Sequence, residues 1–105
     1  MNHEFYYKNI NIYGTEKLKK LYVNQNRPLT RVETRLVTQL VATKEAYDHI
    51  YADTLGYSME CTSAFHDYNK VCKALIKVCK AINRAAKVIT EVEMEVFGRW
   101  YNINI

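Results

Sequence analysis

Cationic residues recur between positions 70 and 87 at alternating intervals of three and four residues. An α-helix turns once every 3.6 residues, so this interval places the whole series along one line of a helix. The segment is therefore predicted to be helical, with a narrow edge that carries only positive charge. We call this edge the basic ridge, and it consists of Lys70, Lys73, Lys77, Lys80, Arg84 and Lys87.

Two apolar series with the same interval run beside the basic ridge. Together they form a wide apolar face, which predicts that the helix packs against other helices on two sides. The first series is Val71, Ala74, Val78, Ala81, Ala85 and Val88. The second series is Cys61, Phe65, Tyr68, Cys72, Leu75, Cys79, Ile82, Ala86 and Ile89.

The second apolar series contains no charged residue, and a chain of 105 residues is a small domain of modest stability. We therefore predict that the protein is a homo-oligomer in which this series joins the copies. The residues expected in that contact are Cys72, Leu75, Cys79, Ile82 and Ile89.

The remaining sequence predicts a mainly α fold in a single helical domain, residues 1–105. Its main parts are a long helical hairpin and a short N-terminal helix. Before that short helix, residues 4–13 are expected to be extended, because Ile10 and Ile12 alternate with asparagines.

Short polar residues mark the expected helix starts. Thr15 can cap the short helix. Thr30 and Glu33 have the spacing of a capping box, which starts the first long helix of the hairpin. Gly56 is expected to end that helix in the left-handed conformation, and Ser58 can cap the helix that carries the basic ridge.

The far end of the ridge helix has two predicted outcomes. A helix that reaches Phe97 would have ~40 residues and span ~60 Å, whereas a compact chain of this size has a radius of gyration of ~13 Å. The helix therefore either breaks or projects into an oligomer. Residues 91–96 alternate with a period of two, which also fits a strand that turns at Gly98. The alternatives are thus a small β pairing of the terminal segments, 9–12 with 102–105, or an α+β fold with a C-terminal hairpin.

The middle of the chain, residues 46–69, resembles the helix-turn-helix family. The segment from Tyr51 to Thr62 has a small residue, then a glycine four positions on, then a serine that would open the recognition helix. The resemblance implies a DNA-reading helix after the turn. The segment departs from the family pattern at Thr62, where an apolar residue is preferred, and Glu60 and Asp67 would repel phosphates. The alternative is an αα-hairpin whose turn contains a glycine.

A second DNA-binding order is that of ribbon-helix-helix proteins. It would take residues 6–12 as the ribbon strand, followed by a short helix, a turn and a capped helix. Asn9 and Asn11 would then face a groove of the DNA, and the last 50 or so residues would be an extension.

Two clusters, Tyr47-Asp48-His49 and His66-Asp67-Tyr68, flank Gly56 almost symmetrically. Imidazoles and carboxylates at similar heights of a hairpin could bind a metal ion or exchange protons. Their spacing matches no ligand motif, so we expect these residues to be polar side chains at the rim of a helix pair.

The sequence also lacks the motifs of common enzyme classes. Three isolated glycines cannot form a phosphate-binding loop, and no nucleophile motif is present. The protein is therefore predicted to be no enzyme, with no catalytic residue, cofactor or metal ion.

The cysteines and the apolar segments bear on location. Cys72 and Cys79 would lie ~10 Å apart along a helix, which exceeds the reach of a disulfide. With an odd number of cysteines, the thiols are expected to be reduced and the protein cytoplasmic. No apolar segment approaches the ~18 residues that span a membrane, and the N-terminus lacks the pattern of a signal peptide.

These features predict a binding module that docks on another macromolecule, most simply a protein. A small regulator or inhibitor of the kind that phages encode would fit. The alternative is a nucleic-acid-binding regulator that uses residues 46–69 or the basic ridge, residues 70–87. A line of cations can approach several phosphates, can meet an anionic protein, or can simply be the solvated edge of a packed helix. The net charge of +4 permits an acidic partner without requiring one.

Overall fold

The computed structural model describes residues 3–25, 27–55 and 58–104, and it gives the backbone alone for His3 and for residues 88–104. Within these residues the chain forms four helices and no strand. The helices are α1 (His3–Tyr13), α2 (Glu16–Tyr22), α3 (Arg31–Thr54) and α4 (Met59–Asn104). The prediction of a mainly α fold is confirmed, whereas the α+β alternative and the β pairing of the terminal segments are not supported.

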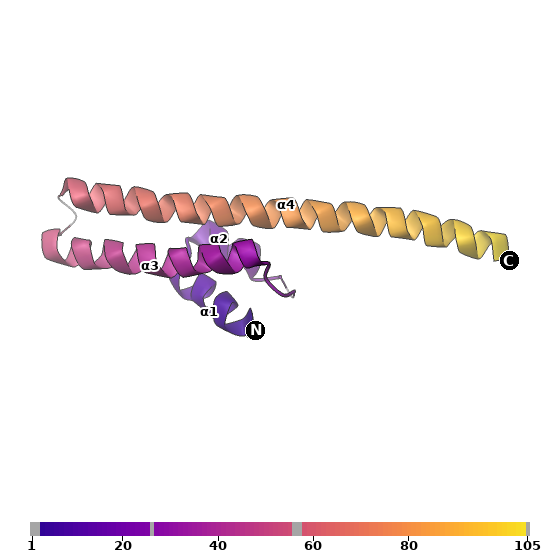
Figure 1. The fold of residues 1–105 in the computed structure, drawn as a ribbon, viewed down its shortest axis with the longest axis horizontal. Helices are drawn as coiled ribbons and strands as arrows, with labels where there is room; N and C mark the ends of the chain where they lie inside the picture. The colour runs from indigo at the N-terminus through magenta and orange to yellow at the C-terminus, as the bar shows by residue number, and fades with distance from the viewer. Residues whose placement is uncertain (1–2, 26, 56–57, 105) are drawn as a thin grey trace.

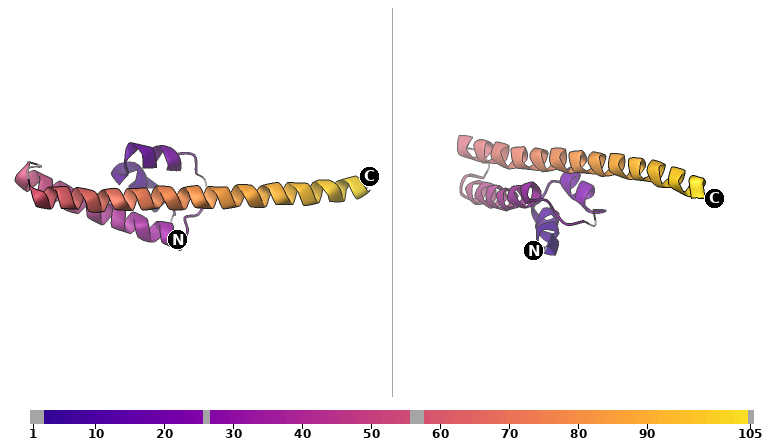
Figure 2. Two further views of the ribbon diagram at one scale, coloured as in Figure 1. Left: turned by 90° about the horizontal axis from the view of Figure 1, so that it is seen from above. Right: turned by 45° about the vertical axis from the view of Figure 1, so that its right-hand side comes forward.

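Helices α3 and α4 run antiparallel and form the predicted long hairpin (Figure 1). The two short helices pack beside it: α1 contacts α3 and α2, and α2 contacts α4. Seen from above, α2 and α3 lie on opposite sides of α4 (Figure 2). Helix α4 is thus packed on two sides, as its wide apolar face predicts.

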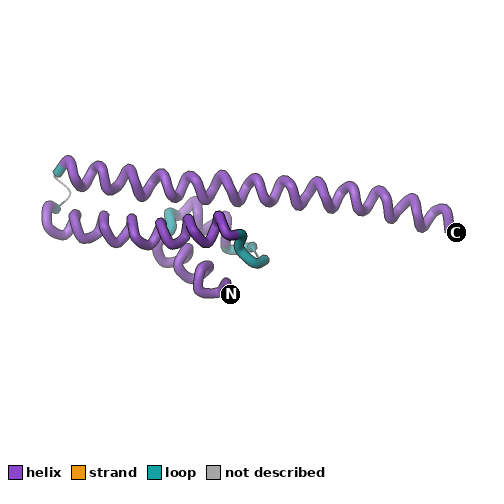
Figure 3. The backbone as a smooth tube through the Cα atoms, viewed as in Figure 1, coloured by secondary structure: helices purple, strands orange, loops and turns teal. Residues whose placement is uncertain are grey.

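Helix α4 is a single helix of 46 residues that projects far beyond the end of α3 (Figure 3). The longest extent of the molecule is 71 Å and its radius of gyration is 19.0 Å, well above the ~13 Å of a compact chain of this size. The helix does not break, so it projects, and the oligomer into which it was predicted to project stays a prediction. The strand predicted at residues 91–96 and the turn at Gly98 are wrong, because the helical backbone continues through both.

Residues 4–13, predicted to be extended, form α1 instead. Tyr6, Ile10 and Tyr13 recur at the three-to-four-residue interval of a helix and pack on the core, and Ile10 is 1% exposed. Ile12 remains 54% exposed, so the local alternation of Ile and Asn does not mark a buried face. The ribbon-helix-helix interpretation needed a strand at residues 6–12 and is therefore wrong.

The predicted helix starts are confirmed in detail. The Thr15 hydroxyl accepts a hydrogen bond from the backbone N–H of Leu18, and Thr30 and Glu33 form both halves of the capping box. The Ser58 hydroxyl accepts from the N–H of Cys61 at 3.0 Å. The left-handed residue that ends α3 is Leu55, with φ of 55°. The sequence predicted this left-handed conformation for Gly56, which lies outside the described residues.

The core joins all four helices at the base of the hairpin. The hydroxyl of Tyr68 on α4 donates to the backbone carbonyl of Tyr13 at 2.6 Å, which fastens the end of α1 to the hairpin. Among the side chains that the structure describes, the last buried one on α4 is Cys79, so the described core occupies the first half of that helix. The buried hydrophobic residues of this core are Ile10, Leu18, Tyr22, Leu29, Val37, Leu40, Tyr68, Cys72, Leu75 and Cys79.

Candidate functional site

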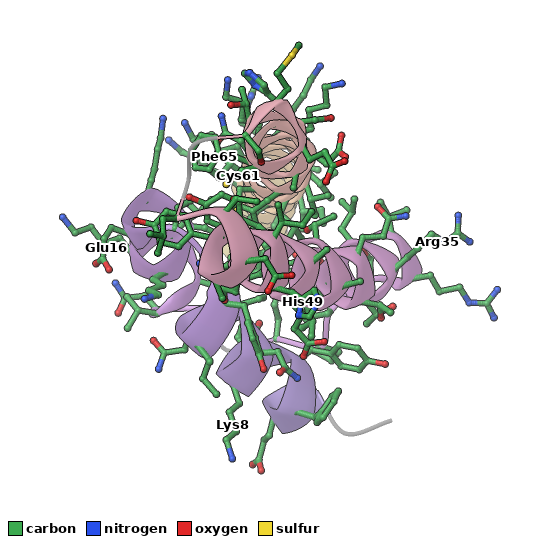
Figure 4. The ribbon with its side chains drawn as sticks, turned by 90° about the vertical axis from the view of Figure 1, so that its left-hand side faces the viewer. Lys8, Glu16, Arg35, His49, Cys61 and Phe65 are labelled. Atoms are coloured by element: carbon green, nitrogen blue, oxygen red, sulfur yellow. The ribbon has the colours of Figure 1, made fainter. Side chains whose placement is uncertain are left out.

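Every residue of the basic ridge is exposed to solvent. The core side of α4 carries Tyr68, Cys72 and Leu75, so the helical period directs the ridge away from the core. Viewed along α4, nitrogen-tipped side chains extend from the side of that helix that faces away from α3 (Figure 4). None of the six ridge cations takes part in an ion pair with another described side chain.

The ridge forms one wall of a shallow groove between α2 and α4. Lys17 of α2 provides the opposite wall, and the groove has a volume of about 270 Å³. Five of its six lining residues are cations, and no carboxylate lines it. The lining residues are Lys17, Lys73, Ile76, Lys77, Lys80 and Arg84. We call this feature the cationic groove.

A buried carboxylate holds α2 in the position that forms the groove. Glu33 is 0% exposed and accepts hydrogen bonds from both terminal nitrogens of Arg27, at 2.7 and 3.0 Å. It also accepts from the hydroxyl of Tyr22 on α2 and from the backbone N–H of Thr30, the latter at 3.1 Å. Arg27 in turn lies against α4, with Nη2 3.8 Å from the sulfur of Cys79. This network, which we call the Glu33 network, joins α2, α3 and α4.

The electrostatics of the Glu33 network favour its charged form. Burial acts to raise the pKa of Glu33, but the hydrogen bonds from Arg27 and Tyr22 outweigh burial and hold the pKa below its ordinary value. Burial and the bond to Glu33 raise the pKa of Tyr22. The bond to Glu33 raises the pKa of Arg27. Because Glu33 is enclosed and already accepts from four groups, it is suited to fixing helices rather than to exchanging protons with a substrate.

Sequence reasoning identified Glu33 only as part of a capping box and did not identify Arg27 or Tyr22. The available signal was the position of Arg27 in the turn just before that box. Which carboxylate an arginine in a turn will meet depends on how the turn folds, and no helical interval encodes it.

The two histidine clusters lie on the hairpin but do not form one site. Tyr47 of α3 contacts Phe65 of α4, with ring centroids 5.5 Å apart. His49 instead pairs along its own helix with Asp53, at 3.7 Å between Nε2 and Oδ2, and His66 packs edge-on against Phe65. Among the described residues, no group of three or more His, Cys, Asp or Glu side chains could hold a metal ion.

The helix-turn-helix resemblance of residues 46–69 does not extend to the arrangement of the helices. In that family the two helices cross at ~90–120°, whereas α3 and α4 lie antiparallel along the whole of α3 (Figure 1). The first turns of α4 pack against the rest of the molecule, so Cys61 is only 3% exposed and Tyr68 only 6% exposed. The αα-hairpin alternative describes this geometry.

The residues predicted to mediate self-association lie largely inside one chain. Cys72, Leu75 and Cys79 are at most 1% exposed and pack within the core. Ile82 is half-buried, and the side chain of Ile89 lies outside the described part. For these three residues, packing against the other helices accounts for their apolar character. A second copy could reach the three buried side chains only if this core opened.

In comparisons with protein-family models, curated proteins and solved structures, nothing matches this chain. A functional assignment must therefore come from the site itself. No helix in the described part of the chain is long and apolar enough to cross a membrane.

Proposed function

We propose that the protein is a non-enzymatic binding module that docks on an anionic macromolecule through the basic ridge and the cationic groove. One observation carries the proposal: two different helices place five cations around one groove without a carboxylate among them. Like charges held this close repel one another, and a bound polyanion would relieve that repulsion.

The shape of the cationic surface favours an extended ligand over a small one. The ridge runs through 17 helical steps, from Lys70 to Lys87, which corresponds to ~26 Å. Residues 68–90 contain no Asp or Glu, so the charge is uninterrupted over this length. A polymer that carries regularly repeated anionic groups can contact many of these cations at once.

A module of this kind acts by occupying its partner, which is how a small regulator or inhibitor works. The proposal needs no catalytic group or cofactor. It places the protein in the cytoplasm, where its three thiols would stay reduced.

The test compares two variants that each lose three positive charges. In the ridge variant, Lys73, Lys77 and Lys80 are changed to Gln. In the control variant, Lys8, Arg31 and Arg35 are changed to Gln; these residues are exposed on α1 and α3, and Lys8 and Arg35 point away from α4 (Figure 4). We expect the ridge variant to elute from immobilised heparin at clearly lower salt than the control variant. Equal elution of the two variants would contradict the proposal.

A second candidate function, self-association, is favoured by the projecting half of α4. A helix without tertiary contacts is marginally stable in water, so a second copy that covers this half would stabilise both. The contact would use the part of α4 beyond the core, where the second apolar series continues from the half-buried Ile82 to the exposed Ala86. Light scattering between about 10 and 200 µM, concentrations at which contacts of micromolar affinity form, is the test. A monomer throughout that range would contradict it.

A further inference from the structure

We infer that the ligand of the cationic groove is the sugar-phosphate backbone of duplex nucleic acid, bound without regard to sequence. This inference rests on the proposed function and specifies its partner. It is carried by the hydrogen-bonding chemistry of the groove, by the spacing of its cations and by the absence of aromatic residues from its lining.

The side chains of the groove can donate hydrogen bonds but cannot accept them. Lysine ammonium and arginine guanidinium groups carry donors alone, and Ile76 contributes only apolar surface. A phosphodiester backbone presents acceptors alone, so it matches this lining. An acidic polypeptide also brings backbone N–H donors, for which the side chains of the groove offer no acceptor. The lining therefore favours nucleic acid over an acidic protein.

The spacing of the cations suits a repeating phosphate. Successive ridge members differ by three or four residues, which is ~4.5–6 Å along the helix. One strand of a duplex presents a charge every ~3.4 Å along its axis, so flexible lysine side chains can reach several phosphates from one straight helix. Lys17 contributes a cation from the opposite wall, so a strand that lies in the groove is contacted from both sides.

The composition of the groove favours a duplex and argues against sequence reading. Proteins that hold single strands stack the bases on aromatic side chains, and no aromatic residue lines the cationic groove. Reading of base edges commonly uses side-chain amides or bidentate arginines in the major groove. The groove has no amide and a single arginine, Arg84, which is the last ridge residue along the chain that lines it.

The experiment measures binding by fluorescence anisotropy as a function of salt, with the full chain and three probes. The probes are a DNA duplex of about 20 base pairs, one of its strands alone, and poly-glutamate of matched charge. For the duplex, each phosphate contact contributes ~0.9 to the slope of log K against log salt. The ridge variant should therefore reduce the slope by up to ~2.7, Lys17→Gln alone by ~0.9, and the control variant by much less. Two duplexes of unrelated sequence should bind alike.

The possible outcomes separate the inference from the proposed function. Poly-glutamate that binds as tightly as the duplex and depends equally on the ridge would overturn the nucleic-acid inference and leave the polyanion module standing. A single strand that binds more tightly than the duplex would overturn the duplex assignment. If no probe binds at about 50 mM salt, which favours phosphate contacts, both fail. Far-ultraviolet circular dichroism of each variant shows whether the variant is folded before its binding is interpreted.

Discussion

The two halves of α4 share one helical backbone but have different surroundings. In the first half, Tyr68, Cys72, Leu75 and Cys79 are buried against the other three helices. The second half leaves the body of the molecule and runs on without a neighbouring helix (Figure 1). The same interval of apolar residues continues through both halves, so the pattern specifies which side of a helix can be buried but not whether anything covers it.

This difference separates two sources of helix stability. The base of the hairpin is stabilised by tertiary contacts, whereas the projecting half relies on local helix propensity and on any partner that it meets. It also separates two uses of the surface. The basic ridge begins beside the core and continues toward the projection, so the backbone that carries the groove lysines Lys73 and Lys77 belongs to the packed half.

The largest expected effect comes from a charge placed in the packed half. Leu75 is 0% exposed, so Leu75→Asp would bury a carboxylate without a partner and should cost several kcal/mol, enough to unfold a domain of this size. Urea denaturation followed by circular dichroism measures the loss. The same change at the exposed Ala81, six residues further along α4, should have a much smaller effect. Similar losses at the two positions would show that the core is not where the structure places it.

The next largest effect is expected in the Glu33 network. Glu33→Gln would leave Arg27, whose side chain is 24% exposed, without its carboxylate partner, and removal of one member of a buried ion pair costs ~3–5 kcal/mol. Glu45→Gln, on the exposed face of the same helix, is the matched control. A loss below 1 kcal/mol for Glu33→Gln would contradict this description of the network.

The Glu33 network also predicts a pH dependence. The pKa of Glu33 is lowered in the folded protein, so its contribution to stability is fully present above the ordinary glutamate pKa of ~4.3. That contribution is lost as the pH falls through the lower, folded-state pKa. Urea midpoints between pH 7 and pH 3 should therefore decline on acidification, and Glu33→Gln should flatten that decline. An unchanged slope in the variant would exclude Glu33 as its source.

The smallest effect is expected from removal of the projecting half. The last buried side chain described on α4 is Cys79, and the backbone of its second half runs without a neighbouring helix (Figure 1). Deletion of residues 88–105 should therefore change the free energy of unfolding by less than ~1 kcal/mol, as changes outside a core usually do. Circular dichroism should report less helix and a similar urea midpoint, and any self-association should be lost. A collapse of the midpoint would show that the projection packs on the body in solution.

Local signals in the sequence were enough for the hairpin and its helix starts. The caps at Thr15, Thr30 and Ser58 and the packing of α4 depend on neighbours within a few residues or on one helical period, which a sequence displays directly. The basic ridge was found in the same way, and the structure leaves it exposed. Its role in binding remains a prediction.

The differences arose where tertiary contacts decide. The alternation of Ile10 and Ile12 favoured a strand, but the packing of Ile10 against Leu18 and its neighbours selects a helix. Lys17 joins the cationic groove because the Glu33 network holds α2 beside α4, and no pattern within α2 predicts that contact. The second apolar series is an apolar line on α4, and the sequence alone could not show that Cys72, Leu75 and Cys79 pack within the same chain. Whether the rest of the series joins two copies stays a prediction.

The long-range hydrogen bonds also have a consequence for the order of folding. Arg27 meets Cys79 across 52 residues, and Tyr68 meets Tyr13 across 55 residues, whereas only residues 55–58 separate α3 from α4. Closure of a long loop costs more chain entropy than closure of a short one, and nearby contacts form faster. We therefore expect the hairpin to form first and α1 and α2 to dock on it afterwards. In that order the ridge exists early, and the groove is completed only in the last step of folding.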